Sequence, residues 1–321
     1  MTLRLGVLGC AGVAWRRTLP SLARLPELTV AAIASRDPAK AAEFTRRFGG
    51  EAVSGYRALL DRPDIDAVYI PLPASLHPEW IDAALRAGLH VLVEKPLATT
   101  QSAANELALS AVARDRVLVE NFAFLHHRAH AEVRALLAAG VIGELRAFTA
   151  DFAFPPLPAG DIRYQPELAG GALFDAGVYP IRAAQLFLGP DLEVAGATLT
   201  MSPEYGVDIA GSALLTSPVG IPAQLHFGFA HSYRCAYTLW GEQGRISVHR
   251  AFTFPDDFTP VVRIMRHSGI EERTLAPDAQ FTNGLAAFAR AIRNSEKTDV
   301  DSIVRQAALV EAVATAARRI R

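Results

Sequence analysis

Cysteine is scarce in this sequence, which has two, Cys10 and Cys235, among 321 residues. Because a disulfide-bonded scaffold needs several cysteines, the count excludes that class and leads us to expect a reducing, cytoplasmic compartment. An excess of charge is also missing, since 32 Lys and Arg against 33 Asp and Glu give a formal net charge of −1. The balance offers no basis for a nucleic-acid or membrane-surface partner, and we expect neither.

Long uncharged apolar runs and low-complexity segments are absent as well. No apolar run reaches the roughly 20 residues of a membrane span. The first residues lead directly into a strand pattern, without a basic stretch followed by a long apolar one, so we expect no signal peptide. What the sequence does have is 50% hydrophobic residues, enough for a large core. Its length favours two domains.

Short apolar runs alternate with helical patterns over the first third of the chain. The strands expected there are residues 3–8, 28–34, 67–70, 90–94 and 117–120. Such alternation is typical of an α/β domain with a parallel sheet covered on both faces. Between residues 192 and 249, β-rich runs follow one another without helices, which favours an antiparallel sheet. We therefore expect a Rossmann dinucleotide-binding domain over residues 1–121 and an α+β domain with a large, mainly antiparallel sheet over 122–321.

A glycine-containing turn follows the first expected strand. Residues 9–14 read Gly-Cys-Ala-Gly-Val-Ala, with Gly9 at the first position of a phosphate-binding fingerprint. Ala11 and Ala14 stand where the second and third glycines are usual, so the motif is degenerate. A strand before it and a helical pattern after it nevertheless predict that the helix start faces a dinucleotide pyrophosphate.

The end of the second expected strand predicts which dinucleotide binds. NAD sites usually carry a carboxylate there, whereas this strand ends in Ser35 and Arg36. A guanidinium pairs with the 2′-phosphate of NADP, so we predict NADP. Asp37 argues for NAD, but its place before Pro38 predicts a helix cap instead. The alternative for Arg36 is an ordinary solvated arginine.

Two further motifs carry polar side chains to candidate positions. The run at 90–94 ends in Glu94-Lys95-Pro96, which places Lys95 at the carboxyl end of a strand, where α/β sheets bind ligands. Its alternative is a solvated strand-end lysine, and Glu94 could orient the loop or be structural. Asp175 and Tyr179 are four residues apart and therefore share one helix face. That face could instead pack on the sheet, with the tyrosine hydroxyl bonded locally.

Taken together, three segments resemble the glucose–fructose oxidoreductase/inositol dehydrogenase (Gfo/Idh/MocA) family. They are residues 9–14, Glu94-Lys95-Pro96 and residues 170–180, and the resemblance covers nearly the whole chain. Residues 120–127, 160–164 and 178–182 resemble more narrowly the dTDP-3-keto-6-deoxyhexose 3-ketoreductases of deoxysugar biosynthesis. Ala11 fits this subgroup, whereas Ala123 departs from it, because a larger residue is expected there.

The resemblance implies hydride transfer between a nicotinamide and a sugar ketone. A lysine ammonium can stabilise the charge that develops on the ketone oxygen and supply the proton, which is the role expected of Lys95. Tyr179 is expected to assist, and Asp175 to bind a substrate hydroxyl or the cofactor ribose. The residues implied around NADP are Gly9, Cys10, Ala11, Gly12, Val13, Ala14, Trp15, Ser35, Arg36, Tyr56, Leu72, His77, Glu94, Lys95, Arg163 and Asp175. We expect no metal, because His126 and His127 lack a third ligand at useful spacing.

The activity implied is NADPH-dependent reduction of the C3 ketone of a dTDP-3,4-diketo-2,6-dideoxyhexose in antibiotic biosynthesis. One alternative is an NADP-dependent dehydrogenase of a free sugar or dihydrodiol, which would need no nucleotide pocket. Another is a non-catalytic dinucleotide-sensing regulator, although such proteins can lose the lysine or tyrosine that this chain keeps. We also expect a homo-oligomer, because an antiparallel sheet whose outer face is apolar must be covered, commonly by another subunit. Five apolar residues should supply this surface. They are Ala195, Ala197, Leu199, Ile209 and Leu214.

Overall fold

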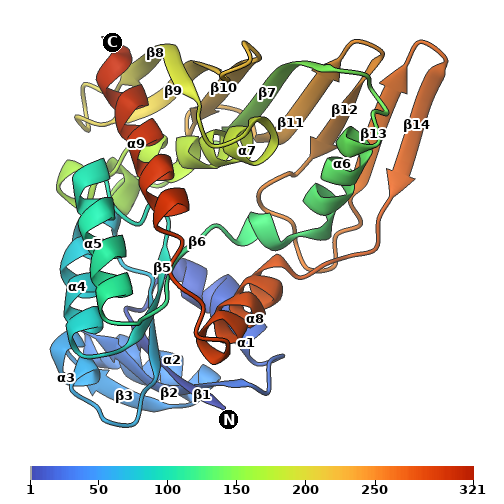
Figure 1. Ribbon diagram of the computed structural model, residues 1–321. Coiled ribbons are helices and arrows are strands. Elements are labelled where there is room, and N and C mark those ends of the chain that lie inside the picture. The colour runs from blue at the N-terminus through green and yellow to red at the C-terminus, as the bar shows by residue number, and fades with distance from the viewer. Residues whose placement is uncertain (1) are drawn as a thin grey trace. The chain divides into compact units, whose positions relative to one another are not determined.

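The computed structural model describes residues 2–321 as two compact units (Figure 1). Unit 1 runs to Phe122 and includes Phe281–Val304, whereas unit 2 contains Ala123–Gln280 and Arg305–Arg321. Residues 281–304 were expected in the second domain, so that assignment is corrected. The reason is packing, since Leu285 and Phe288 are buried in the same core as the first strand of unit 1.

Unit 1 is built on a parallel sheet of six strands. Their order, β3-β2-β1-β4-β5-β6, is that of a Rossmann fold, which confirms the predicted class. The strands are β1 (Leu3–Leu8), β2 (Leu28–Ser35), β3 (Glu51–Ser54), β4 (Ala67–Ile70), β5 (His90–Glu94) and β6 (Leu118–Asn121). The pattern did not predict β3, because its residues are largely exposed and form no apolar run. The order reverses between β1 and β4, the point where such sheets bind ligands at the carboxyl ends of their strands.

Helices cover both faces of this sheet. They are η1 (Ala14–Thr18), α1 (Leu19–Leu22), α2 (Pro38–Phe48), α3 (Tyr56–Leu60), η2 (Ala74–Leu76), α4 (His77–Arg86), α5 (Gln101–Ala113) and α8 (Gln280–Arg293). Helices α1, α2 and α8 share one core with β1, and α4 lies beside α5, as Figure 1 shows. Asp37 caps α2, where its Oδ1 accepts the Ala39 N–H at 2.9 Å, so the predicted cap is confirmed.

Unit 2 is built on a nine-stranded sheet that is mostly antiparallel, as predicted. Its order is β14-β13-β12-β11-β7-β10-β9-β8-β15, with β7–β10 and β8–β15 the parallel pairs. The strands are β7 (Leu145–Ala153), β8 (Glu193–Met201), β9 (Asp208–Thr216), β10 (Pro222–Gly228), β11 (Arg234–Gly241), β12 (Gly244–His249), β13 (Val261–Arg266), β14 (Gly269–Thr274) and β15 (Ala317–Ile320). The last three were not predicted, because charged residues interrupt their sequences.

The register corrects the expected apolar face of this sheet. Leu214 points outward, since its neighbours Ala213 and Leu215 are buried. Ala197 pairs with Ala213 and therefore points inward, as does Leu199, which is 4% exposed. Ile209 also lies on the inward side of β9, because it is an even number of residues from the buried pair. An exposed Trp240 was not anticipated, and the strand pairing places it on the same face as Leu214.

The inward face of the sheet is packed by helices and aromatic rings. The helices are η3 (Ala123–His126), α6 (Arg128–Ala138), η4 (Ile162–Tyr164), η5 (Pro166–Leu168), η6 (Leu173–Gly177), α7 (Val178–Leu188) and the end of α9 (Val300–Ala316). Figure 1 shows α6 and α7 lying along the sheet. Phe187 of α7 packs on Phe148 and Tyr237 of the strands, with ring centroids 5.9 and 4.9 Å apart. Within residues 2–321, no helix is long and apolar enough to cross a membrane.

Candidate active site

The turn after β1 has the shape that a phosphate-binding turn requires. Gly9 has φ +116°, and a Cβ added to it would lie 2.7 Å from Leu72 Cδ2. Only glycine accommodates both conditions. The short distance also shows that Leu72, in the loop that follows β4, packs directly on the turn after β1. Helix η1 begins at Ala14 and continues as α1, which directs a helix N-terminus at this turn. The geometry fits the pyrophosphate of a dinucleotide.

Arg16 adds a positive charge to the same turn and is not among the site residues predicted from the sequence. A Cβ on Gly12 would lie 2.8 Å from Arg16 Nη1, so the guanidinium lies over the glycine backbone. An arginine four residues after a glycine on a helix was the available signal. A guanidinium at this position suits an anionic ligand.

The proposed 2′-phosphate position lies at the end of β2. Ser35 is buried, and its Oγ accepts the Asp37 N–H at 3.1 Å. Arg36 is exposed and lies beside Tyr56, the hydroxyl of which has its pKa raised by burial and lowered, to a smaller extent, by that guanidinium. Arg36 therefore presents the positive charge here, and Ser35 acts mainly on the local backbone.

Two neighbouring residues have partners within the fold. The Trp15 ring packs on Phe44 and Phe48, with centroids 4.9 and 5.3 Å away, and the Trp15 backbone N–H donates to the Ala11 carbonyl oxygen. Cys10 is a half-buried free thiol, and burial raises its pKa. These contacts explain the residues structurally, and their expected contact with a cofactor stays a prediction.

Glu94, immediately before Lys95, is held in a buried hydrogen-bond network. Its Oε1 accepts the Tyr69 hydroxyl and the Asn121 side-chain amide, both at 2.7 Å. The Tyr69 hydroxyl in turn lies 2.9 Å from Thr18 Oγ1. Burial raises the pKa of Glu94, although these donors oppose the shift. Glu94 therefore anchors the end of β5. Its partners could not be predicted from the sequence, because Tyr69 and Asn121 are 25 and 27 residues away from it.

His77, expected at the cofactor, has both ring nitrogens occupied by the protein. Nδ1 lies 2.7 Å from the Pro96 carbonyl oxygen, and Nε2 lies 2.8 Å from that of Leu72. The side chain is 1% exposed, and burial lowers its pKa to about 4. His77 thus joins the loops that follow β4 and β5, and offers no ring nitrogen to a ligand.

In unit 2, Asp175 and Tyr179 stand on a helix whose start is tightly packed. Asp175 belongs to η6, a π-helical turn, which often marks functional positions. A Cβ on Gly171 would lie 2.2 Å from Asp208 Oδ1, and Asp208 Oδ2 accepts the Leu173 N–H at 2.7 Å. Asp208 was not predicted as part of this site. Gly171 therefore makes room for this carboxylate at the start of the helix.

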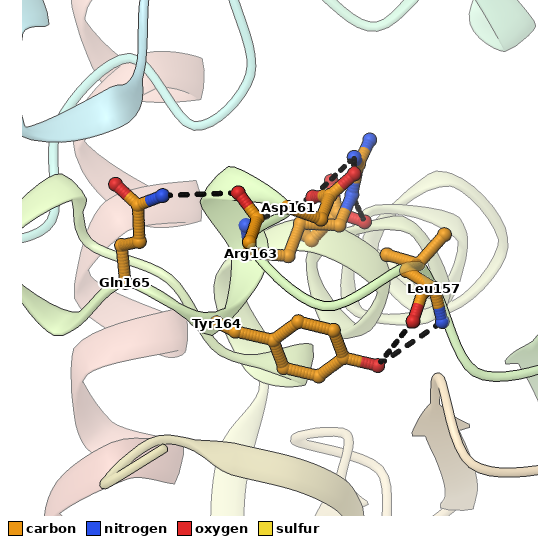
Figure 2. A network of polar contacts seen from close by, with 7 residues as sticks. Leu157, Asp161, Arg163, Tyr164 and Gln165 are labelled. Carbon is orange, nitrogen blue, oxygen red and sulfur yellow. Dashed lines mark hydrogen bonds and ion pairs between the residues drawn. The ribbon is translucent and has the colours of Figure 1, made fainter.

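Arg163 joins the loop before η6 to Asp175. Its Nε donates to Asp175 Oδ2 at 2.6 Å, and its Nη1 to Asp161 Oδ1 at 3.1 Å. Figure 2 shows Arg163 beside Asp161, and Tyr164 directed at the backbone of Leu157. The two carboxylates, Asp175 foremost, raise the pKa of Arg163. Arg163 and Asp175 therefore act as one charge-paired unit.

Tyr179 projects into an aromatic cluster on the inward face of the sheet. Its ring centroid lies 5.1 Å from that of Phe152, 5.8 Å from Phe252 and 5.9 Å from Phe124. The rings fix its orientation while the residue remains partly exposed. An oriented, partly exposed phenol can bind or protonate an oxygen.

The two adjacent histidines have separate structural positions. His126 ends η3, and His127 caps α6 by accepting the Ala129 N–H at Nδ1. In the part of the chain that the structure describes, no group of three or more His, Cys, Asp or Glu side chains is arranged to hold a metal ion.

The six-stranded parallel sheet, the glycine turn and the basic residues beside it define a dinucleotide-binding oxidoreductase with a second, mainly antiparallel unit. Residues 3–122 match the model of the oxidoreductase family with an NAD-binding Rossmann fold, and residues 130–247 match the GFO/IDH/MocA C-terminal domain. The chain belongs to the Gfo/Idh/MocA family of oxidoreductases.

Relatives within the family are similar over their whole length. A dTDP-3,4-didehydro-2,6-dideoxy-α-D-glucose 3-reductase of Actinomadura kijaniata is 52% identical, over 99% of this chain and 96% of its own. A protein of the same name from Saccharopolyspora spinosa is also 52% identical, over 98% of each chain. A D-xylose 1-dehydrogenase (NADP⁺) of Haloferax volcanii is 36% identical, over 92% of this chain and 91% of its own.

A solved structure extends the similarity to three dimensions. KijD10, a 3-ketoreductase from A. kijaniata in complex with NADP and TDP-benzene, superimposes with a TM-score of 0.98 at 52% identity, covering 100% of this chain and 99% of the other. Variants of that protein with a tyrosine replaced by phenylalanine, or a lysine replaced by alanine or glutamate, are also solved.

Proposed function

We propose that this protein is an NADPH-dependent sugar 3-ketoreductase that converts a dTDP-3,4-diketo-2,6-dideoxyhexose to the 3-hydroxy-4-keto sugar. The observation that carries the proposal is the full-length similarity, at 52% identity, to reductases of that substrate. The chain also keeps Lys95, Asp175 and Tyr179, the residues on which the chemistry would depend. A regulator that only senses dinucleotides would not need them.

The residues of this chain have separate tasks in the proposed reaction. NADPH, when bound, supplies the hydride that reduces C3. Lys95 stabilises the negative charge on the ketone oxygen and donates the proton that completes the hydroxyl. Tyr179 assists as a hydrogen-bond donor to the substrate. Asp175, held by Arg163, orients a substrate or ribose hydroxyl as an acceptor.

The preference for NADPH rests on charge at the end of β2. Arg36 and Arg16 bring two guanidinium groups to the dinucleotide-binding edge of unit 1, and the carboxylate of Asp37 is used in capping α2. A carboxylate that is not engaged in capping a helix would repel a 2′-phosphate at this place, whereas guanidinium groups pair with it. We expect kcat/KM with NADPH to exceed that with NADH at least tenfold. Equal use of NADH would contradict the assignment.

A dehydrogenase of free sugars is the second candidate, and the 36% identity to a D-xylose 1-dehydrogenase favours it. The two candidates differ in whether the substrate must carry a nucleotide. Incubation with enzymatically generated dTDP-3,4-diketo-2,6-dideoxyglucose and NADPH should produce rapid NADPH oxidation, which is measured by absorbance. Free D-xylose and D-glucose should give no reduction of NADP⁺. The reverse result would establish the free-sugar activity and overturn the proposal.

We further propose a cytoplasmic homo-oligomer that acts in antibiotic deoxysugar biosynthesis. Exposed Leu214 and Trp240 share the outer face of the unit 2 sheet, with exposed fractions of 40% and 63%. The same face carries a charged pair, in which Arg234 Nε donates to Asp151 Oδ2 at 2.7 Å. Mixed surfaces of this kind are typical of subunit contacts. Light scattering should give a dimer or tetramer mass, and a Trp240→Glu variant should dissociate; a concentration-independent monomer would refute the assembly.

A further inference from the structure

The backbone that carries Lys95 is held by side chains after the strand ladder ends. β5 pairs with β6 as far as Glu94 and Asn121, and the chain then leaves the sheet. Pro96 has no N–H to donate, so its carbonyl and the next N–H must find other partners. The Leu97 N–H donates to the Glu120 carboxylate at 2.9 Å. The Pro96 carbonyl faces His77 Nδ1 at 2.7 Å.

His77 is suited to this contact by its position. It is the first residue of α4, and α4 packs on β4 and β5. A helix of ten residues docked on two strands is a rigid support, whereas the loop that carries Lys95 has no ladder of its own. The imidazole therefore fixes Pro96, the residue that follows Lys95, relative to α4.

The two contacts of the ring compete for one proton. Both partners of His77 are carbonyl oxygens, which only accept, and a neutral imidazole has a single N–H. The Pro96 carbonyl is buried, whereas Leu72 is partly exposed and its carbonyl contact is only part-buried. A buried acceptor left without a donor costs more than one that water can reach. The proton thus belongs on Nδ1, toward Pro96.

We propose that His77 is a positioning residue for the reaction: its Nδ1–H donates to the Pro96 carbonyl and fixes the backbone that carries Lys95. The inference rests on the role proposed above for Lys95. The Nε2 side of the ring lies against the Leu72 carbonyl, and the Leu72 side chain packs on Gly9 in the dinucleotide-binding turn. The Nδ1–H therefore holds the loop that carries Lys95, whereas Nε2, which has no proton, makes no hydrogen bond to the Leu72 carbonyl.

Two conservative variants test which ring nitrogen carries the contact. Asparagine places an amide N–H near the position of Nδ1, and glutamine places one near that of Nε2. His77→Asn should keep kcat within about threefold of wild type. His77→Gln should lower kcat on the order of tenfold or more, since a displacement of about 1 Å at a catalytic group can cost up to about a hundredfold. Equal losses of kcat in both variants, or no loss in either, would overturn the proposal.

A double-mutant cycle ties the effect to Lys95. If His77 acts through Lys95, His77→Gln should lower single-turnover NADPH oxidation much less in a Lys95→Ala background than in wild type. An equal loss in both backgrounds would show a general structural role. Lys95→Ala with full activity would instead remove the proposed role of Lys95, a result distinct from any failure at His77.

A measurement on the unaltered protein does not depend on variant folding. In ¹⁵N-histidine-labelled enzyme, two-bond ¹H–¹⁵N correlation should show the His77 ring protonated at Nδ1 at pH 7.5. A ring protonated only at Nε2 would leave the Pro96 carbonyl without its donor and would refute the inference.

Discussion

At the scale of single residues, the site is a set of side chains whose partners restrict what each can do. Asp175 is paired with Arg163, and Glu94 accepts from Tyr69 and Asn121, so both carboxylates are committed as acceptors. Lys95 lies next to the buried Glu94 and is itself partly exposed. Among the candidate residues, Lys95 and Tyr179 are thus the ones suited to donate a proton.

Replacement of these two donors should separate their roles. We expect Lys95→Ala to lower kcat by about 10²–10⁴-fold, the usual contribution of a general acid. Tyr179→Phe should lower kcat less, because it removes a hydrogen bond and leaves the aromatic packing in place. NADPH oxidation is the measurement, with Lys297→Ala, an exposed lysine, as the control that should match wild type. A larger loss of kcat in Tyr179→Phe than in Lys95→Ala would assign the role of proton donor to the tyrosine.

At the scale of elements, the helix with Asp175 and Tyr179 is positioned by glycines that face one phenylalanine. Phe227 of β10 is 1% exposed, and Cβ atoms built on Gly177 and Gly211 would lie 3.0 and 2.5 Å from its ring. Gly177 belongs to η6 and Gly211 to β9. The two glycines therefore let a helix and a neighbouring strand pack on the same ring.

This packing predicts a strong difference between two glycine substitutions in adjacent strands. Gly211→Ala should destabilise the protein by about 1–3 kcal/mol, because the added methyl overlaps Phe227 and Leu199 Cδ2. Gly196→Ala, in β8, is the matched control: its Cβ would meet nothing within 4 Å. That variant should stay within about 0.5 kcal/mol of wild type. Chemical denaturation of both variants is the measurement, and equal midpoints would contradict the packing described.

At the scale of the whole molecule, the sequence predicts whatever depends on local periodicity and little that depends on distant pairing. The parallel and antiparallel sheets followed from apolar runs and their alternation, and the Asp37 cap from a dipeptide. The return of residues 281–304 to unit 1 could not follow, because nothing local shows which core receives an amphipathic helix. Asp208 capping the backbone at Leu173 was equally hidden, as 35 residues separate the two.

Histidines with lowered pKa values occur in both units. His77, His127 and His130 are buried and His90 is half-buried. Burial lowers the pKa of His77 and His90 in unit 1 to about 4. In unit 2 it lowers the pKa of His127 to about 4 and that of His130 to about 3. The Nδ1 atoms of His90 and His127 accept backbone N–H groups at 2.9 and 3.1 Å, and protonation there would break those bonds.

Both units should therefore lose stability as the pH falls from about 6.5 toward 4. In that window the unfolded chain, whose histidines have a pKa near 6.5, binds protons that the folded chain excludes, so unfolding is favoured. The raised pKa values of Glu94 and Asp208 stabilise the folded chain as the pH falls. These two carboxyls are outnumbered by the four histidines, so the net effect is a loss of stability. Thermal midpoints should fall for every transition seen between pH 6.5 and 5, and a constant midpoint would contradict the argument.

One variant tests the source of this acid sensitivity. His127→Asn keeps an acceptor at the start of α6, where asparagine is a favoured cap, but cannot titrate. It should lose some stability at pH 7.5, because the His127 ring stacks on Phe254 at 3.9 Å. Its midpoint should nevertheless fall less between pH 6.5 and 5, since each excluded proton is worth at most about 1.4 kcal/mol per pH unit. His267→Asn, at an exposed position, should show the same slope as wild type. An unchanged slope in His127→Asn would assign the acid sensitivity to other groups.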